Sequence, residues 1–398
     1  MSPRARLAAG LVASLTLLSI GWTGLLIPSL IRSIETTFGQ NDAGLGIVYL
    51  VYAIAYASGS FVGGPLTERV GRRPVLGGAA LVTGVGAAGL GLAPSWALFV
   101  FAALTLGAGA GCLDGGANGL VLDVYREGRG RAMNLLHMSF ALGALAAPLI
   151  VGTLVDHGVA WQEIAVATGA VVSLLAIAYV LVPMPSGRRT TVTARPAQPA
   201  AAGGRGGRLL VSGPLLLLGV AIALYVASEV GVSNWLVRFL EPAPITTATL
   251  ALSLYWAGLA VGRLVSSIIS DRFDHLRFTI ACALALAVLI GAAVLCPLLP
   301  LSIAAFAAAG VASGPIFPMI VAIGGERYPE RSAAVGGSLT GMAVIGSIIY
   351  PPAIGFLSVT VGLGAAMFGN ALLALACVLA LVAFGRSTRR LRSAPPGP

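Results

Sequence analysis

The stretch GLGIVYLVYAIAYASGSFVGG at residues 44–64 is a continuous apolar run, and PLTERVGRR at residues 65–73 follows it directly. An apolar run of about 20 residues is long enough to cross a lipid bilayer as one helix. The charged cluster behind it would hold the end of such a helix at the membrane surface. The sequence therefore predicts a membrane-spanning helix over about 44–66, and the same pattern recurs along the chain.

Further apolar runs, bounded by Arg, Pro or Gly clusters, predict eleven more spans. The twelve spans are expected at roughly 7–31, 44–66, 74–93, 97–122, 132–154, 163–183, 212–236, 246–269, 277–297, 300–323, 332–358 and 361–385. The chain is 57% apolar and 10% charged, whereas a soluble domain averages about 25% charged residues. These numbers exclude a soluble enzyme and predict an all-α membrane protein with twelve transmembrane helices.

The types of residue present exclude several kinds of chemistry. All 24 basic residues are Arg, because the chain contains no Lys. This excludes a Lys-bearing phosphate loop of the kind that drives ATP-powered pumps, and it excludes Schiff-base catalysis. The three His and four Cys are too dispersed for a zinc or redox site. We therefore expect no enzyme activity, no metal and no cofactor. The Arg-, Ala- and Gly-rich composition suggests a GC-rich bacterial genome.

The placement of Arg predicts the orientation of the chain. If both termini are cytoplasmic, 21 Arg lie on the cytoplasmic side, Arg32 and Arg238 lie outside, and Arg263 lies within a span. Such an excess of positive charge on one side is typical of the cytoplasmic face. We expect a multi-pass protein of the bacterial cytoplasmic (inner) membrane. The net charge of +10 then reflects topology and anionic lipid, with no need for a nucleic-acid partner.

A polar segment at 185–210 divides the chain into two similar halves, 1–184 and 211–398. Several residues recur at a constant offset of 203 positions. The matching pairs are Gly59 and Gly262, Glu68-Arg69 and Asp271-Arg272, Tyr125 and Tyr328, Gly143 and Gly346, Pro148 and Pro351, and Gly152 and Gly355. We therefore predict two parallel six-helix repeats. Such repeats suit alternating access, in which two similar bundles rock around a site at their interface.

The segment Gly64 to Arg73 carries a recognisable motif at the predicted cytoplasmic end of the second span. It resembles the major facilitator superfamily, whose corresponding loop reads Gly, three residues, Asp, Arg, any residue, Gly, Arg, Arg; here Glu68 replaces the Asp. The resemblance covers the whole chain and implies that the acid latches one state against a helix N-terminus of the opposite half. The expected gating residues are Glu68, Arg69, Arg72, Arg73, Arg263, Asp271 and Arg272. A plain surface anchor is the alternative.

Charged residues inside spans are informative because each costs at least about 2.5–3.5 kcal/mol on insertion scales. Asp114, Glu229 and Arg263 are predicted to lie well inside spans. Asp114 and Asn118 share one helical stripe with Gly107 and Gly111, which indicates a close-packed or cavity-lining face. The alternative for Arg263 is a side chain that extends toward the cytoplasmic surface.

Four patches resemble the fucose–galactose–glucose:proton symporter branch of the same superfamily, which also includes animal sodium-linked glucose transporters. They are 107–118, 225–235, 258–263 and 134–143. The resemblance implies a sugar as solute. One departure is that fucose permeases carry a carboxylate in the first span, where this chain offers Ser19, Trp22 and Thr23.

The candidate solute-binding residues combine carboxylates, hydrogen-bonding groups and aromatic rings. They are Asp114, Asn118, Asn134, His137, Glu229, Trp22 and Trp235. Glu229 and Asp114 are also the candidates for proton coupling, because a desolvated carboxylate can exchange a proton with solute occupancy. The alternative for Asn134, His137 and the two Trp is a position at the membrane interface.

The leading hypothesis is a secondary active transporter that takes up a sugar or similar polar solute with protons, with sodium as the alternative ion. A proton-driven exporter of drugs or metabolites is the second hypothesis, because Gly143, Pro148 and Gly152 resemble the Gly–Pro signature of superfamily antiporters. A sensor or scaffold that no longer transports is the third. The expected partners are the solute, the coupling ion and the lipid bilayer, and we expect a monomer.

Overall fold

The computed structural model describes residues 2–125, 129–184 and 213–393. Within this described part, twelve helical segments are long and apolar enough to cross a membrane, which confirms the predicted number. The expected linker at 185–210 lies outside the described residues. So do six of the Arg that were assigned to the cytoplasmic side: Arg126, Arg188, Arg189, Arg195, Arg205 and Arg208.

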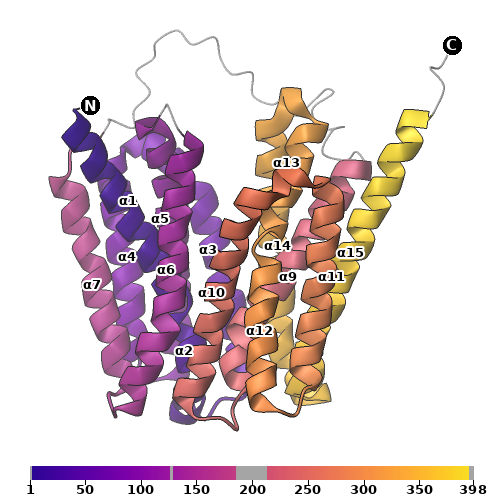
Figure 1. The fold of residues 1–398 in the computed structure, drawn as a ribbon. Coiled ribbons are helices and arrows are strands. Elements are labelled where there is room, and N and C mark those ends of the chain that lie inside the picture. The colour runs from indigo at the N-terminus through magenta and orange to yellow at the C-terminus, as the bar shows by residue number, and fades with distance from the viewer. Residues whose placement is uncertain (1, 126–128, 185–212, 394–398) are drawn as a thin grey trace. The chain divides into compact units, whose positions relative to one another are not determined.

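The twelve spans are built from fourteen described α-helices (Figure 1). They are α1 (Pro3–Gly24) with α2 (Leu26–Phe38), α3 (Asp42–Val70), α4 (Arg72–Leu92), α5 (Trp96–Val124), α6 (Arg129–Asp156), α7 (Trp161–Leu181), α9 (Gly213–Phe239), α10 (Ile245–Ile269), α11 (His275–Leu295), α12 (Leu299–Ser313) with α13 (Ile316–Arg327), α14 (Ser332–Val361) and α15 (Leu363–Ser393). Two short 3₁₀ helices are η1 (Ser270–Arg272) and η2 (Pro329–Arg331).

The first span is longer than the sequence predicts and is broken once. The prediction over about 7–31 ended before Arg32, but helix α2 continues through Arg32 and Glu35 to Phe38. It can do so because both charged side chains find partners within the protein, as described below. The break lies at Leu25, whose N–H donates to the carbonyl of Trp22 at 3.2 Å instead of continuing the α-helical pattern.

Local sequence sets the ends of the helices around the motif. Asn41 precedes α3, and its side-chain oxygen accepts a hydrogen bond from the N–H of Gly44 at 3.2 Å, as expected for a helix N-cap. Gly71 separates α3 from α4 with a φ of 111°. Residues that carry a Cβ atom rarely adopt this backbone conformation. The motif glycine is therefore what allows α3 to end and α4 to begin within one residue.

By their internal contacts, the helices form two units, each described here by itself. The first comprises Met1–Thr190, Asn234–Trp256 and Gly355–Val359, and the second comprises Thr191–Ser233, Ala257–Ile354 and Thr360–Pro398. In the first unit, α3 packs on α5, α4 on α5 and α7, and α1 on α6. In the second, α11 packs on α12 and α15. The first unit thus includes short segments from the second half of the sequence.

The packing of α3 on α5 is repeated by α10 on α12 and the residues after it. In each pair, glycines sit where an added Cβ would strike a backbone carbonyl of the facing helix, so the helices approach closely. The contacts are Gly59 with Ala108 and Gly111 with Tyr56 in the first repeat, and Gly262 with Val311 and Gly314 with Leu259 in the second. Every partner recurs at the offset of 203 positions, which confirms two six-helix repeats.

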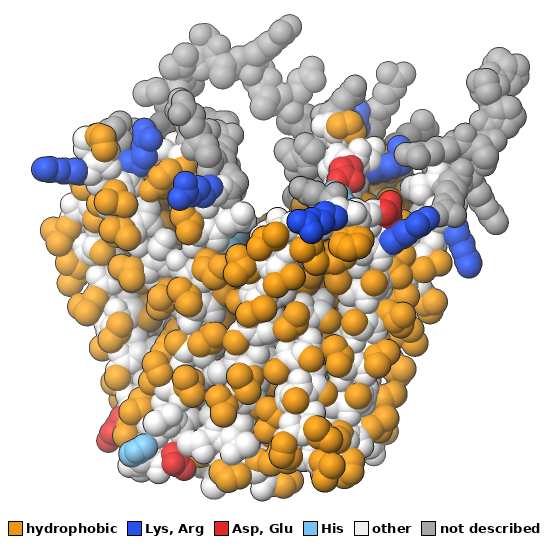
Figure 2. All heavy atoms as spheres, viewed as in Figure 1, with side chains coloured by type: hydrophobic (Ala, Val, Ile, Leu, Met, Phe, Trp, Pro, Cys, Tyr) orange, Lys and Arg blue, Asp and Glu red, His pale blue; other side chains and the backbone are white. Residues whose placement is uncertain are grey.

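The outer flanks of the helices are apolar. Figure 2 shows hydrophobic side chains over the visible flank of both units, with Arg side chains gathered near one end of the helices. Large apolar side chains such as Leu92, Leu181 and Leu295 are about 70% exposed (69%, 73% and 70%). Such a surface would be unfavourable in water and suits contact with lipid chains. The protein is therefore a multi-pass membrane protein.

The close approach of α3 and α5 predicts that replacing glycines on α5 affects stability only where the glycine faces α3. Gly111→Ala should lower the unfolding free energy by about 1–3 kcal/mol, because a backbone carbonyl cannot rotate away from the new methyl group. Gly119→Ala is the matched control, since nothing lies within 4 Å of the corresponding Cβ and Ala favours a helix. Thermal unfolding in detergent measures both. Equal melting temperatures for the two variants would contradict the close packing.

Candidate functional site

A polar cluster surrounds Glu229 inside the second unit. Glu229 lies on α9 one turn after Tyr225, whose hydroxyl donates to the carboxylate oxygen Oε2. Ser313, at the end of α12, donates to the same oxygen at 3.3 Å and lies 3.1 Å from the Tyr225 hydroxyl. The carboxylate of Glu229 thus accepts from one hydroxyl on its own helix and from another on α12.

Arg263 on α10 completes this cluster electrostatically. Its positive charge acts on Glu229, although no ion pair within 4 Å joins the two among the described residues. The guanidinium Nε of Arg263 is buried and has no hydrogen-bond partner within the described part of the chain. The cluster therefore offers a carboxylate, two hydroxyls and a spare cationic donor, a set that can bind the hydroxyl groups of a polar solute.

A second polar cluster lies in the first unit, around Asp114 on α5. The side-chain amide of Asn118 donates to Asp114 Oδ1 at 2.9 Å, as expected for residues one turn apart. Tyr56 on α3 lies beside the same carboxyl group and interacts with it. Tyr52 stacks on Tyr56, with ring centroids 6.1 Å apart. Tyr56 therefore belongs to the polar cluster around Asp114.

Asn118 keeps part of its hydrogen-bonding capacity. Its Oδ1 atom is buried without a partner among the residues that the structure describes. A buried acceptor that lacks a donor is costly, by about 1–3 kcal/mol. Asn118 is therefore suited to accept a hydrogen bond from a ligand. Asp114 is half-buried beside it.

The other predicted solute-binding residues have different surroundings. Trp22 is half-buried, and its indole N–H donates to Thr168 at 3.1 Å. Trp235 is fully buried with its ring edge-on to Tyr49, the centroids 5.5 Å apart. Asn134 and His137 are exposed side chains on α6.

The motif residues divide into exposed and paired groups. Glu68 and Arg69 are exposed at the end of α3. Arg72, at the start of α4, is buried and forms an ion pair with Asp123 near the end of α5. Arg73 donates to the carbonyl of Val182 at 3.3 Å. In the second repeat Arg272 is exposed in η1, and the side chain of its neighbour Asp271 lies outside the described residues.

The sequence analysis missed an ionic cluster at the opposite end of α3. Arg238, near the end of α9, donates through Nε to Asp42 at the start of α3 and forms an ion pair with Glu35 on α2, both at 2.9 Å. It also pairs with Glu241 through Nη1. The Glu35 and Asp42 side chains are only 11% and 10% exposed. Arg238 therefore compensates two nearly buried carboxylates.

Arg32 strengthens the same junction through backbone groups. Its guanidinium donates to the carbonyls of Val237, Leu240 and Ala243 at 2.6–3.1 Å, so it occupies the end of α9 and the turn behind it. Cations are favourable there because the carbonyls at a helix C-terminus lack backbone partners. Arg32 and Arg238 were expected merely to lie outside. The sequence signal that could have revealed the cluster is that both Arg and the acidic residues Glu35 and Asp42 lie at the ends of neighbouring spans.

Two glycine contacts join the halves of the sequence at equivalent positions. A Cβ on Gly152 of α6 would strike Thr249 of α10, and a Cβ on Gly355 of α14 would strike Asp42 and Gly46 of α3. Gly152 and Gly355, like Gly46 and Thr249, are separated by the repeat offset. Segments of both halves are thus closely packed within the first unit, and the second contact involves Asp42 of the ionic cluster.

Comparison with known proteins identifies relatives and folds. Residues 11–242 and 207–398 match the family model described as Major Facilitator Superfamily. A Mus musculus protein named sodium-dependent glucose transporter 1A is 32% identical over 136 residues, or 33% of this chain. The match covers only 31% of the mouse protein's length.

Two solved structures share the fold. A bacterial homologue of the human lysosomal transporter Spinster has a TM-score of 0.80 and 16% identity, with both chains fully covered (100%). The E. coli fucose:proton symporter has a TM-score of 0.62 and 19% identity, covering 94% of this chain and 98% of the other. At such identities the likeness concerns the fold alone.

The ionic cluster predicts a strong effect of removing its central cation. Arg238→Gln should destabilise the protein by about 3–5 kcal/mol, because Glu35 and Asp42 would remain nearly buried without their compensating charge. Glu241→Gln is the control: that side chain is 58% exposed, and an exposed pair contributes about 0–1 kcal/mol. Denaturation in detergent measures both variants. A loss for Arg238→Gln no larger than for the control would show that the cluster contributes little.

Proposed function

The chain belongs to the major facilitator superfamily, and we propose that this transporter takes up a sugar or similar small polar solute together with protons. The single observation that carries the proposal is the cluster of Glu229, Tyr225 and Ser313 beside Arg263. It places a carboxylate and several hydroxyl partners within apolar helices. The names of the mouse relative and of the fucose symporter support a sugar as solute.

Coupling follows from the cost of charge at Glu229. An ionised carboxylate within a span requires compensation, from a cation, from hydrogen-bond donors or from a proton. A protonated Glu229 can donate a hydrogen bond to a hydroxyl group of the bound solute, so the proton and the solute stabilise one another at the site. Proton binding and solute binding are therefore linked at one residue. Asp114, with Asn118 and Tyr56, is the second candidate coupling group.

Alternating access requires that contacts between the halves of the sequence open and re-form. The cluster of Arg238, Glu35 and Asp42 is suited to this task because it joins helices of both halves. The motif at the other end of α3 supplies the opposing latch, with Glu68 as the acid. We place the motif end in the cytoplasm of a bacterium, with both chain termini and most Arg, and assign the six-helix bundles to 1–184 and 211–398. A monomer is sufficient for this mechanism.

The solute class can be tested by thermal shift. Purified protein is screened against D-glucose, D-galactose, L-fucose, glycosides and cationic drugs. Stabilisation by one class of sugar supports the proposal, while stabilisation by cationic drugs alone would favour an exporter. Repeating the screen with and without Na⁺ at fixed pH distinguishes sodium from protons, because a coupled ion changes the apparent affinity for the solute.

Glu229→Gln should separate binding from coupling. The variant keeps the size and hydrogen bonding of the side chain but cannot titrate. We expect it to bind the stabilising sugar and exchange it down a gradient, while its proton-driven accumulation ratio in vesicles falls to about one. Glu241→Gln, the same change at an exposed site, should accumulate like the parent. If Glu229→Gln accumulates the solute normally, Glu229 is not the coupling group, and Asp114 or a bound sodium ion takes that role.

A further inference from the structure

The ion pair of the motif has a counterpart in the second half of the chain. Arg72 at the start of α4 pairs with Asp123, 51 residues later, near the end of α5. His275, the first residue of α11, bonds through Nδ1 to Oε1 of Glu326 at 2.6 Å, also 51 residues later and near the end of α13. Both partners lie at the repeat offset of 203 positions. The two halves therefore carry a base–acid pair at equivalent places, and each of these two pairs is called a brace below.

The two braces differ in the chemistry of the cation. The guanidinium of Arg stays charged at all pH values that a cell experiences. Imidazole is the side chain whose charge ordinarily changes between pH 5 and 8. The Arg72–Asp123 pair is therefore permanent, whereas His275–Glu326 is an ion pair only when His275 is protonated. Neutral His275 can still donate one hydrogen bond, which is weaker than a charge-assisted one.

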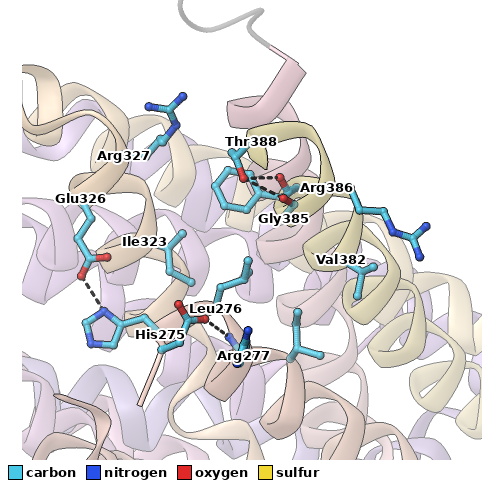
Figure 3. Close-up of a pocket in the computed structure, with 13 residues that line it drawn as sticks. His275, Leu276, Arg277, Ile323, Glu326, Arg327, Val382, Gly385, Arg386 and Thr388 are labelled. Carbon is cyan, nitrogen blue, oxygen red and sulfur yellow. Dashed lines mark hydrogen bonds and ion pairs between the residues drawn. The ribbon is translucent and has the colours of Figure 1, made fainter. Parts of the chain in front are cut away.

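The surroundings of His275 leave the imidazole open to solvent protons. It lies at a cavity of about 510 Å³ between the start of α11, the end of α13 and α15 (Figure 3). Its side chain is 23% exposed. The charged groups that line the same cavity are Asp274 and Arg277 on α11, Glu326 and Arg327 on α13, and Arg386 on α15.

Among these groups, Glu326 is in direct contact with the imidazole. Figure 3 shows His275 and Glu326 directed toward one another, while Arg327 and Arg386 point away from the pair. Asp274 is engaged as the cap of α11, where it accepts from the N–H of Arg277 at 2.9 Å. The guanidinium of Arg327 lies over the ring of Tyr328, 5.7 Å from its centroid. Glu326 is therefore a direct hydrogen-bond partner of the imidazole at this cavity.

We propose that His275 is a proton-binding site that ties α11 to α13 when it is charged and loosens them when it is neutral. The second half of the transporter then responds to pH at a place where the first half, braced by Arg72, does not. Protonation turns the contact from a neutral hydrogen bond into a charge-assisted one, so a fall in pH favours the transport states that keep it. This site is separate from Glu229 and requires no solute.

Hydrogen–deuterium exchange on the purified full-length protein tests the proposal, with labelling times corrected for intrinsic exchange between pH 5.5 and 8.0. Peptides from the first turns of α11 and the last turn of α13 should lose about three- to tenfold in protection as pH rises. Peptides from the start of α4 and the end of α5 serve as the internal control and should keep theirs. Equal pH dependence in both halves, or none in either, would overturn the proposal.

Variants at the pair sharpen the test. His275→Arg restores the permanent cation of the first repeat, so α11 should stay protected across the whole pH range. Glu326→Gln removes the carboxylate, so protection should be low throughout and independent of pH. A pH slope in His275→Arg that equals the slope of the parent would rule out His275 as the sensor. Should either variant fail to fold, the comparison of the two halves within the parent decides the question.

Discussion

The cost of placing a charge among apolar helices determines where ionised side chains lie in this protein. Within the described part, the carboxylates inside the helices have compensating groups: Glu229 has two hydroxyls and the charge of Arg263, Asp114 has Asn118 and Tyr56, and the Glu35–Asp42 pair has Arg238. Each compensation joins two or more helices. The same groups that make the charges tolerable therefore connect the elements that a transporter must move.

The internal repeat explains why these connections recur. Glycine contacts hold α3 to α5 and α10 to α12 at equivalent positions, and an acid–base brace joins equivalent helix ends in both halves. Where the halves differ, the difference is chemical: Leu26 stands at the repeat position of Glu229, and Arg72 at that of His275. A scaffold of two similar halves thus carries different titratable groups at equivalent positions.

The sequence alone predicted the twelve spans, the two repeats, the motif and the charged residues within the spans. These features are local or repetitive: a span depends on the length of an apolar run, and a repeat on the comparison of the chain with itself. The family was likewise evident from the contiguous motif at Gly64 to Arg73, whose glycine with positive φ at Gly71 is required by the backbone. The first span is longer than predicted and is broken at Leu25, but it still counts as one span, so the number of spans is unchanged.

Only the tertiary structure decided which charges meet. Ser313 reaches Glu229 across 84 residues of sequence, and Asp42 reaches Arg238 across 196. Hydropathy ended the first span before Arg32, because an unpaired charge there would be unfavourable, and this excluded the ionic cluster from the prediction. Compensation of a buried charge depends on partners that the fold brings from other helices. Sequence patterns along one helix therefore show which charged residues need partners. The packing of the helices determines which residues those partners are.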